Sequence, residues 1–281
     1  MPLVLSRQHP VGRRGRSLVV LVAAVVLIGT SSISAAAHPE GPSGERATVV
    51  LVHGAFADAS SWNGVVELLQ RQGHTVVAPA IAMRGLASDA AYVASVVDQI
   101  EGPVLLVGHS YAGAVISNAA TATPNVVGLV FVSGYAPEQG ETVNDIAGRS
   151  QDSLLGPAIV QRQYPTGQGD ETATELFIDP AAFRAAFAAD LPAEQAAAMA
   201  ATQRPIAAAA FDEPSGEPAW KTLPSWAVVG TGDKAAGADV VRANAERAGA
   251  HITELDGSHV IMISQPRAVT HVITTALHAV G

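Results

Sequence analysis

Short runs of β-branched residues and leucine alternate with helical stretches along most of this chain, and that alternation limits the folds it can adopt. Residues 48–52 consist only of such residues, which is typical of a strand buried on both faces in a parallel sheet. Further predicted strands occupy residues 75–78, 103–107, 126–133, 225–229 and 251–255. The chain is therefore predicted to be an α/β protein, with a mostly parallel sheet of about six strands flanked by helices on both faces.

Helical patterns fill the intervals between these strands. Ser60 or Ser61 is placed to cap the first helix and Ser88 the second, because a serine hydroxyl can accept a hydrogen bond from a free N–H group at a helix start. Three more helices are expected over residues 112–120, 238–248 and 267–279. Each predicted helix separates two predicted strands or follows the last one, as a parallel sheet requires.

The alternation breaks between residues 137 and 218. This stretch is rich in alanine and has amphipathic segments at 181–189 and 193–202, but it shows no clear strand pattern. We therefore expect a helical cap, inserted at about 137–218 into a single domain that spans residues 38–281.

The N-terminal segment has the pattern of a secretory signal peptide over residues 1–37. Four arginines and no acidic residue precede an apolar run at 18–28, and three alanines follow at 35–37. An uncleaved anchor is the alternative, although the apolar run is shorter than the roughly 20 residues of a membrane-spanning helix. The protein is expected to be secreted, to the medium or the cell envelope, with no stable membrane association after cleavage. The pair Arg13 and Arg14 leaves twin-arginine export open.

Composition excludes several classes of function. The 281 residues include no cysteine, so disulfides, thiolate metal sites and cysteine nucleophiles are excluded. The net charge is −9 and the pI is about 5.4, which argues against nucleic acid or an anionic membrane surface as a partner.

A candidate nucleophile lies between a predicted strand and a predicted helix. The segment GHSYAG, residues 108–113, contains G-x-S-x-G at that junction. A sharp strand-to-helix turn lifts the serine oxygen above the sheet, and the small residues let the turn close. Ser110 is therefore the predicted nucleophile.

A serine nucleophile needs a base to take its proton and an acid to hold that base. His259 follows the last predicted strand in the turn DGSH, at the sheet end where Ser110 must also lie. Asp233 follows the preceding strand in GTGD and is the predicted acid. Asp256 is the rival acid, but its nearness to His259 in sequence favours a turn-capping role.

An oxyanion formed during such an attack needs two preorganised donors. The N–H group of Tyr111, directly after the nucleophile, is one candidate. The N–H group of Phe56, in the loop after the first strand, is the other. In the same loop Gly54 allows close approach of the backbone, and the His53 ring is expected to brace the loop by hydrogen bonding.

Loop residues just past strand ends are the best candidates for substrate contacts. Met83 and Tyr135 rank first by that criterion. No metal site is expected, because residues along the strand before His259 alternate between faces and His259 has a better role. The chain has no phosphate-binding loop or dinucleotide glycine fingerprint, so no cofactor is expected.

The segments VLVHGAF, GHSYAG, GTGD and DGSH, in this order, resemble the α/β-hydrolase superfamily. The ending GSHVIMISQP is similar to the branch of small-substrate esterases, plant methyl esterases and hydroxynitrile lyases. The resemblance implies ester hydrolysis through an acyl-enzyme, with no cofactor. Two features depart from the family pattern. Only about six strands are visible, so the family's first two strands are either missing or unrecognised in the sequence. Val260 stands where the lyases carry a lysine, which counts against cyanohydrin cleavage.

Three functions follow from these observations. The first is a serine hydrolase that cleaves small carboxylic esters. The second uses the same residues for perhydrolysis, with peroxide in place of water, as in cofactor-free haloperoxidases. The third is a ligand-binding protein that keeps the fold with a slow or idle triad.

Overall fold

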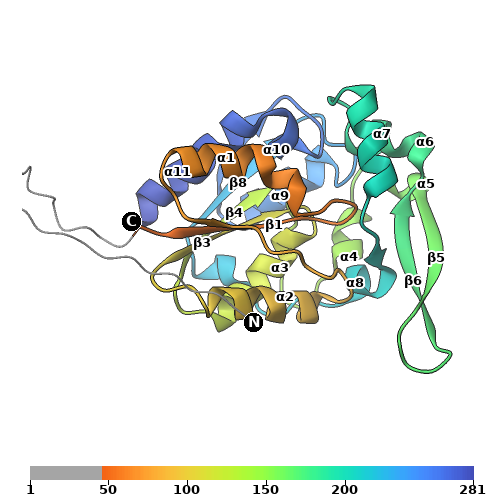
Figure 1. Ribbon diagram of the computed structural model, residues 1–281, viewed down its shortest axis with the longest axis horizontal. Helices are drawn as coiled ribbons and strands as arrows, with labels where there is room; N and C mark the ends of the chain where they lie inside the picture. The colour runs from red at the N-terminus through yellow and green to blue at the C-terminus, as the bar shows by residue number, and fades with distance from the viewer. Residues whose placement is uncertain (1–45) are drawn as a thin grey trace, which may run out of the picture. The chain divides into compact units, whose positions relative to one another are not determined.

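The computed structural model describes residues 46–281, which contain a six-stranded parallel sheet (Figure 1). The strand order is β2-β1-β3-β4-β8-β9, and every neighbouring pair is parallel. The strands are β1 (Thr48–Val52), β2 (Val76–Val77), β3 (Val104–His109), β4 (Val126–Val132), β8 (Ser225–Gly230) and β9 (His251–Leu255). The predicted sheet is thus confirmed, with β2 shorter than its pattern indicated.

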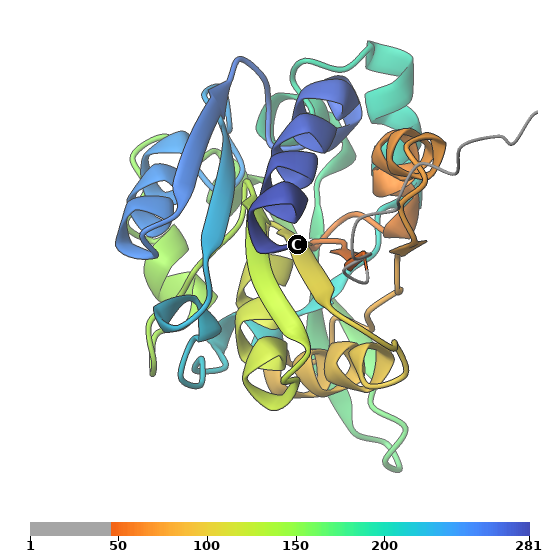
Figure 2. The same ribbon diagram turned by 90° about the vertical axis from the view of Figure 1, so that its left-hand side faces the viewer.

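Helices cover both faces of this sheet (Figures 1 and 2). On one face α1 (Asn63–Arg71) packs against α11 (Pro266–Val280), and on the other α2 (Leu86–Val97) packs against α3 (Ala112–Ala119). The helix α9 (Ala238–Arg247) packs on β8 and β9, and the short α10 (Ile261–Ser264) lies between β9 and α11. Strands β1 and β3 are buried along their whole length, as expected for central strands of a sheet covered on both sides.

Two expected helix caps are wrong. The chain enters α1 through a 3₁₀ turn, η1 (Ala59–Trp62), whose N-cap is Asp58; its carboxylate accepts a hydrogen bond from the Ser60 N–H group at 2.7 Å. Helix α2 begins at Leu86, after Gly85, so Ser88 lies within its first turn. In both places the N-cap residue lies two or three positions before the predicted serine. Differences of this size are usual when helix boundaries are predicted.

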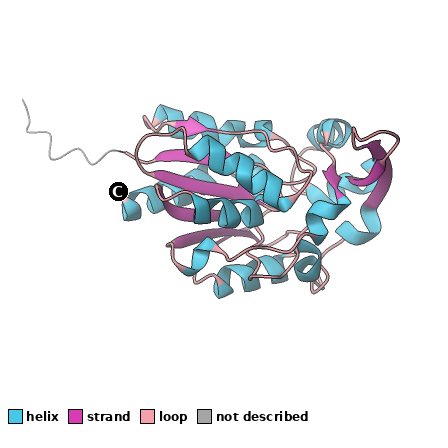
Figure 3. Cartoon of the chain, turned by 90° about the horizontal axis from the view of Figure 1, so that it is seen from below, coloured by secondary structure: helices cyan, strands magenta, loops and turns pink. Residues whose placement is uncertain are grey.

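The segment between β4 and β8 forms a cap that the sequence described only in part. Its helical elements are α4 (Val143–Ala147), α5 (Leu155–Ala158), α6 (Pro180–Phe187), α7 (Ala193–Thr202), α8 (Ala208–Asp212) and the 3₁₀ turn η3 (Ala219–Lys221). It also holds an antiparallel sheet in the order β5-β6-β7, made of β5 (Ile159–Pro165), β6 (Thr172–Ile178) and β7 (Ile206–Ala207) (Figures 1 and 3). The expected cap helices are present, but the expectation that this segment lacks strands is wrong.

The exposure of the β5–β6 hairpin explains why its strands have no recognisable pattern in the sequence. Most of β5 is exposed, so it lacks the buried apolar run on which strand recognition depends. Stacking of Arg162 on Phe177 and of Arg84 on Tyr164, at 4.5 and 4.1 Å from the ring centroids, stabilises it instead.

The predicted signal peptide at residues 1–37 lies outside the described residues. Within residues 46–281, no helix combines the length and apolar character needed to cross a bilayer.

Candidate active site

The predicted site residues follow the carboxyl ends of all six strands of the parallel sheet: Phe56 follows β1, Met83 β2, Ser110 and Tyr111 β3, Tyr135 β4, Asp233 β8 and His259 β9. Because parallel strands all end at one edge of the sheet, the loops after them lie together there. The cap segment also packs on these loops, through α6, α7 and the stretch that follows α7.

Ser110 occupies a strained turn between β3 and α3. Its φ angle is 55°, in the left-handed region that non-glycine residues rarely adopt. Its N–H group donates to the Val132 carbonyl at 3.2 Å, and its carbonyl accepts from the N–H groups of Gly113 and Tyr135 at 2.9 and 3.1 Å. A side chain on Gly108 would meet the Ala112 carbonyl carbon at 2.7 Å, so the turn closes only with glycine there. This is the geometry of a nucleophile elbow.

Asp233 and His259 form a buried pair. His259 Nδ1 lies 2.7 Å from Asp233 Oδ2, and their side chains are 1% and 0% exposed. The other carboxylate oxygen accepts hydrogen bonds from the N–H groups of Ala235 and Ala236. Asp256, the rival acid, makes no such contact; its carbonyl oxygen accepts from Gln265. Since Nδ1 faces a carboxylate, the proton sits there and Nε2 is left as the basic nitrogen.

The structure brings Ser110 near this pair without joining them. Among the described residues no hydrogen bond links Ser110 Oγ to His259. The preceding residue does touch the base: His109 Nε2 donates to the His259 carbonyl at 3.0 Å, and the two ring centroids are 4.7 Å apart. Burial lowers the pKa of His109 well below its usual value, and the neighbouring His259 adds to the effect. His109 is therefore a neutral packing partner of His259.

The predicted oxyanion donors fare differently. Phe56 N–H donates to the carbonyl of Arg204, from the cap, at 3.1 Å. In this closed arrangement the hydrogen is already used, so Phe56 N–H is not a free donor here, and its role as a donor to substrate stays a prediction. Tyr111 N–H and Ala55 N–H find no acceptor in the described part of the chain. Gly54 packs so tightly that a Cβ on it would lie 2.7 Å from Ser110 Cβ, so the loop that carries the next residue, Ala55, passes close to Ser110.

His53 braces the loop after β1, residues 53–58, by hydrogen bonding as expected. Its Nδ1 donates to the Gly54 carbonyl at 3.0 Å, and its Nε2 accepts from Ile81 N–H at 3.1 Å. Burial lowers the pKa of His53, which keeps the ring in the neutral form that can both donate and accept.

Met83 and Tyr135 are both buried at this edge of the sheet. Tyr135 N–H donates to the Ser110 carbonyl. Met83 has a left-handed φ of 56°, and its N–H group donates to Asp89 Oδ1 at 3.0 Å.

Asp89 is a buried residue of the site that carries no distinctive sequence motif. Its Oδ2 accepts from the Tyr111 hydroxyl at 3.0 Å, so one buried carboxyl ties α2 to the Met83 loop and to the nucleophile turn. Burial raises the pKa of Asp89 and also that of Tyr111. A position on an amphipathic helix was the only sequence signal, and it does not distinguish Asp89 from a solvated acid.

Aromatic side chains of the cap cover His259. The Phe187 ring on α6 lies 5.0 Å from that of His259 and 6.1 Å from that of Phe56, and Phe183 packs behind it at 5.1 Å. Asp190 binds the residue before the base, accepting from the Ser258 N–H group at 3.0 Å and from the Ser258 hydroxyl. Ser110 is consequently only 6% exposed and His259 1%.

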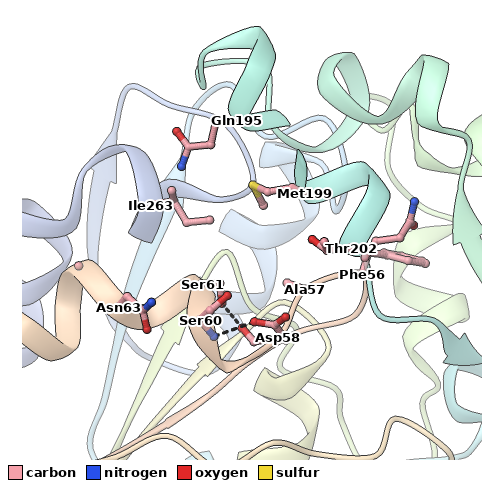
Figure 4. Close-up of a pocket in the computed structure, with 12 residues that line it drawn as sticks. Phe56, Ala57, Asp58, Ser60, Ser61, Asn63, Gln195, Met199, Thr202 and Ile263 are labelled. Atoms are coloured by element: carbon pink, nitrogen blue, oxygen red, sulfur yellow. Dashed lines mark hydrogen bonds between the residues drawn. The ribbon is translucent and has the colours of Figure 1, made fainter. Parts of the chain in front are cut away.

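Two cavities flank this closed centre. The first, called here the Asp58 cavity, has a volume of about 320 Å³ and is lined by the loop after β1, the turn η1 and the start of α1, together with α7 and α10 (Figure 4). The second, the Tyr135 cavity, has about 260 Å³ and a mostly apolar lining that includes Tyr135, Leu155, Leu176, Phe211 and Ala235. Within residues 46–281, no three His, Cys, Asp or Glu side chains gather to hold a metal ion.

Residues 49–272 match the sequence model of the alpha/beta hydrolase family, which is most of the described chain. The protein therefore belongs to this family.

Particular relatives are more distant. A carbendazim hydrolyzing esterase of Nocardioides sp. (strain SG-4G) is 31% identical over 110 residues, covering 34% of this chain and 46% of that protein. Methylesterase 8 of Arabidopsis thaliana is 32% identical over 103 residues, covering 32% of this chain and 38% of that protein. The matched segments thus span less than half the length of either relative.

The solved structure of polyneuridine aldehyde esterase superimposes with a TM-score of 0.70 at 19% identity, covering 83% of this chain and 99% of that one. Similarity at this level concerns the fold. The names of these proteins agree with the resemblance to an esterase branch.

Proposed function

We propose that this protein is a serine hydrolase that cleaves small carboxylic esters through an acyl-enzyme. The observation that carries the proposal is the buried His259–Asp233 pair, with a 2.7 Å contact, at the sheet edge where Ser110 occupies its strained turn. The chain order of nucleophile, acid and base matches that of α/β-hydrolases. The esterase names of the relatives support the same reaction class.

In the first half-reaction Ser110 Oγ attacks the ester carbonyl carbon while His259 Nε2 takes the hydroxyl proton. Asp233 holds Nδ1–H and stabilises the resulting imidazolium. The N–H groups of Tyr111 and Ala55 bind the oxygen that becomes negative. The carbon–oxygen bond to the alcohol then breaks, His259 returns the proton to the alcohol, and the acyl group stays on Ser110.

In the second half-reaction water attacks the acyl-enzyme and gives a proton to His259. The acid departs as that proton returns to Ser110 Oγ, so the enzyme is regenerated. These protein groups supply every proton transfer and charge contact, and the mechanism uses no cofactor. Hydrogen bonds between nucleophile and base are often long in the free enzyme and shorten when substrate binds.

The closed centre requires the cap to open for substrate entry. Phe187 over His259 and the Arg204 carbonyl on Phe56 N–H are contacts that must loosen. Tyr135 lines a mostly apolar cavity and donates its N–H group to Ser110, so this cavity suits the acyl part. Met83 lines neither cavity; it lies in the loop between β2 and α2, which its hydrogen bond to Asp89 holds in place.

Hydrolysis of p-nitrophenyl butyrate tests the proposal. Ser110→Ala should lower kcat by about 10³-fold or more, because it removes the attacking atom. Ser117→Ala is a matched control: Ser117 is buried on α3, and its hydroxyl has no partner among the described residues. Activity retained in Ser110→Ala would refute the mechanism. A product that forms only with added peroxide would instead identify perhydrolysis.

We also propose that the protein is secreted after removal of residues 1–37. Four arginines, an apolar run and a small-residue cleavage site support this. The intact mass of protein recovered from the culture medium or cell envelope should correspond to a chain that starts near His38. A full-length mass confined to the cytoplasm would contradict it.

A further inference from the structure

The Asp58 cavity lies beside the proposed catalytic centre, between the body of the protein and the cap. Figure 4 shows the loop with Phe56, Ala57 and Asp58 on one side and Gln195 and Met199 of α7 on the other. Its volume of about 320 Å³ is within the range of small-molecule sites.

The position of this cavity places it on the side of the catalytic centre from which the alcohol would leave. Phe56 lines it and follows Ala55, the proposed oxyanion donor. Ile263 also lines it, from α10, the helix that begins two residues after His259. Because the base returns its proton to the alcohol oxygen, the alcohol leaves on the side of His259.

The lining of the cavity carries one charge. Asp58 contributes a carboxylate, and no lysine, arginine or histidine is among the described lining residues. Partial burial works to raise the pKa of Asp58, but hydrogen bonds from the hydroxyl and N–H group of Ser60 outweigh it and hold that pKa below its usual value. The carboxylate is therefore ionised at neutral pH. Arg204 adds to the lowering from outside the lining.

Two amide side chains in the lining remain available to a ligand. Gln195 and Asn63 make no side-chain hydrogen bond within the described structure, and Figure 4 shows them on opposite elements. Gln203, by contrast, is already bonded to the backbone of Ile178 and Ala200. The cavity thus offers uncharged donors and acceptors together with one negative charge.

We infer that the Asp58 cavity binds the alcohol part of the ester, and that it favours neutral polar or cationic alcohols over alcohols that carry a carboxylate. This inference rests on the proposed function. Two like charges about 6 Å apart repel enough to change a rate constant roughly 3-fold in a watery site and 100-fold at an effective dielectric constant near 20. Salt screens the effect, so it is measured at low ionic strength.

Three butyrate esters that differ only in the alcohol test the inference: those of ethylene glycol, choline and glycolic acid. The wild-type enzyme should give kcat/KM values in the order choline, glycol, glycolate. In Asp58→Asn the ratio of kcat/KM for the glycolate ester to kcat/KM for the choline ester should rise at least threefold. Asn caps a helix start as well as Asp does, and Asp58→Ser, a second uncharged capping residue, should shift the ratio in the same direction.

Asp98→Asn is the matched control for the loss of one negative charge. Asp98 is exposed at the end of α2, before β3 begins, and therefore at the opposite edge of the sheet from Ser110. The Asp98→Asn variant should have the same glycolate-to-choline ratio of kcat/KM as the wild type. If all three esters are hydrolysed but Asp58→Asn and Asp58→Ser keep the wild-type ratio, the inference is overturned while the proposed function stands. If the wild type hydrolyses no ester, both are overturned.

Discussion

Replacing Tyr111 by phenylalanine removes one hydroxyl group from beneath the nucleophile turn. That hydroxyl donates to Asp89 Oδ2 at 3.0 Å, while Oδ1 keeps the N–H group of Met83. The ring itself stays, with its contact to Phe211 at 5.8 Å between centroids. The variant therefore isolates one buried hydrogen bond.

The expected loss of unfolding free energy is about 2 kcal/mol, because a buried carboxyl loses one of its donors. For a domain of this size that corresponds to a melting temperature lower by about 4–8 °C. Thermal unfolding followed by circular dichroism measures it. A melting temperature within 1 °C of the wild-type value would show that the Asp89–Tyr111 contact does not stabilise the turn.

The pH dependence of stability tests the burial of Asp89, which outweighs the hydrogen bond from Tyr111 in setting its pKa. Burial raises the pKa of Asp89, so the folded state holds the proton more tightly than the unfolded chain does. Its contribution to stability is then full below the unfolded pKa, about 3.9, and is lost as pH rises through the folded pKa. Asparagine does not titrate, so Asp89→Asn should not lose stability as pH rises through this range. The melting temperature of the variant should therefore change less with pH than that of the wild type.

Three further substitutions test the site. Asp233→Asn should lower kcat by about 10⁴-fold with the fold intact, since the amide favours the wrong His259 tautomer. Asp190→Asn should lower kcat/KM about 2- to 10-fold and speed proteolysis of the cap, because an exposed carboxylate that holds Ser258 contributes modestly. Gly54→Ala should lower kcat by about 100-fold or more, since its Cβ would displace the turn beside the proposed donor.

Controls separate these effects from general damage. Glu194→Gln removes a charge from α7 of the cap without any described hydrogen bond, and it should leave both kcat/KM and proteolysis at wild-type levels. A melting temperature for Asp233→Asn far below the wild-type value would mean that the aspartate acts through folding. An active Gly54→Ala enzyme would show that the close approach to Ser110 is dispensable.

The central strands were predictable because their signal is local. A parallel strand buried on both faces must be apolar along its length, and β1 and β3 show this directly in the sequence. Helix α7 was also predicted within its observed bounds from its amphipathic pattern. By contrast, β5 is exposed on most of its length and pairs with β6, so nothing in its local composition distinguished it from a loop.

The sequence by itself determined which side chains follow the ends of the parallel strands, and hence that Ser110, Asp233 and His259 lie at one edge of the sheet. It did not determine which backbone N–H groups there are free. Every non-proline residue carries the same N–H group, so residue type does not say whether it is already bonded. Only the tertiary structure shows that the Arg204 carbonyl, 148 positions further along the chain, takes the N–H group of Phe56 and leaves that of Ala55. Contacts of this kind depend on how the cap packs, as do the cover of Phe187 over His259 and the bond from Asp190 to Ser258.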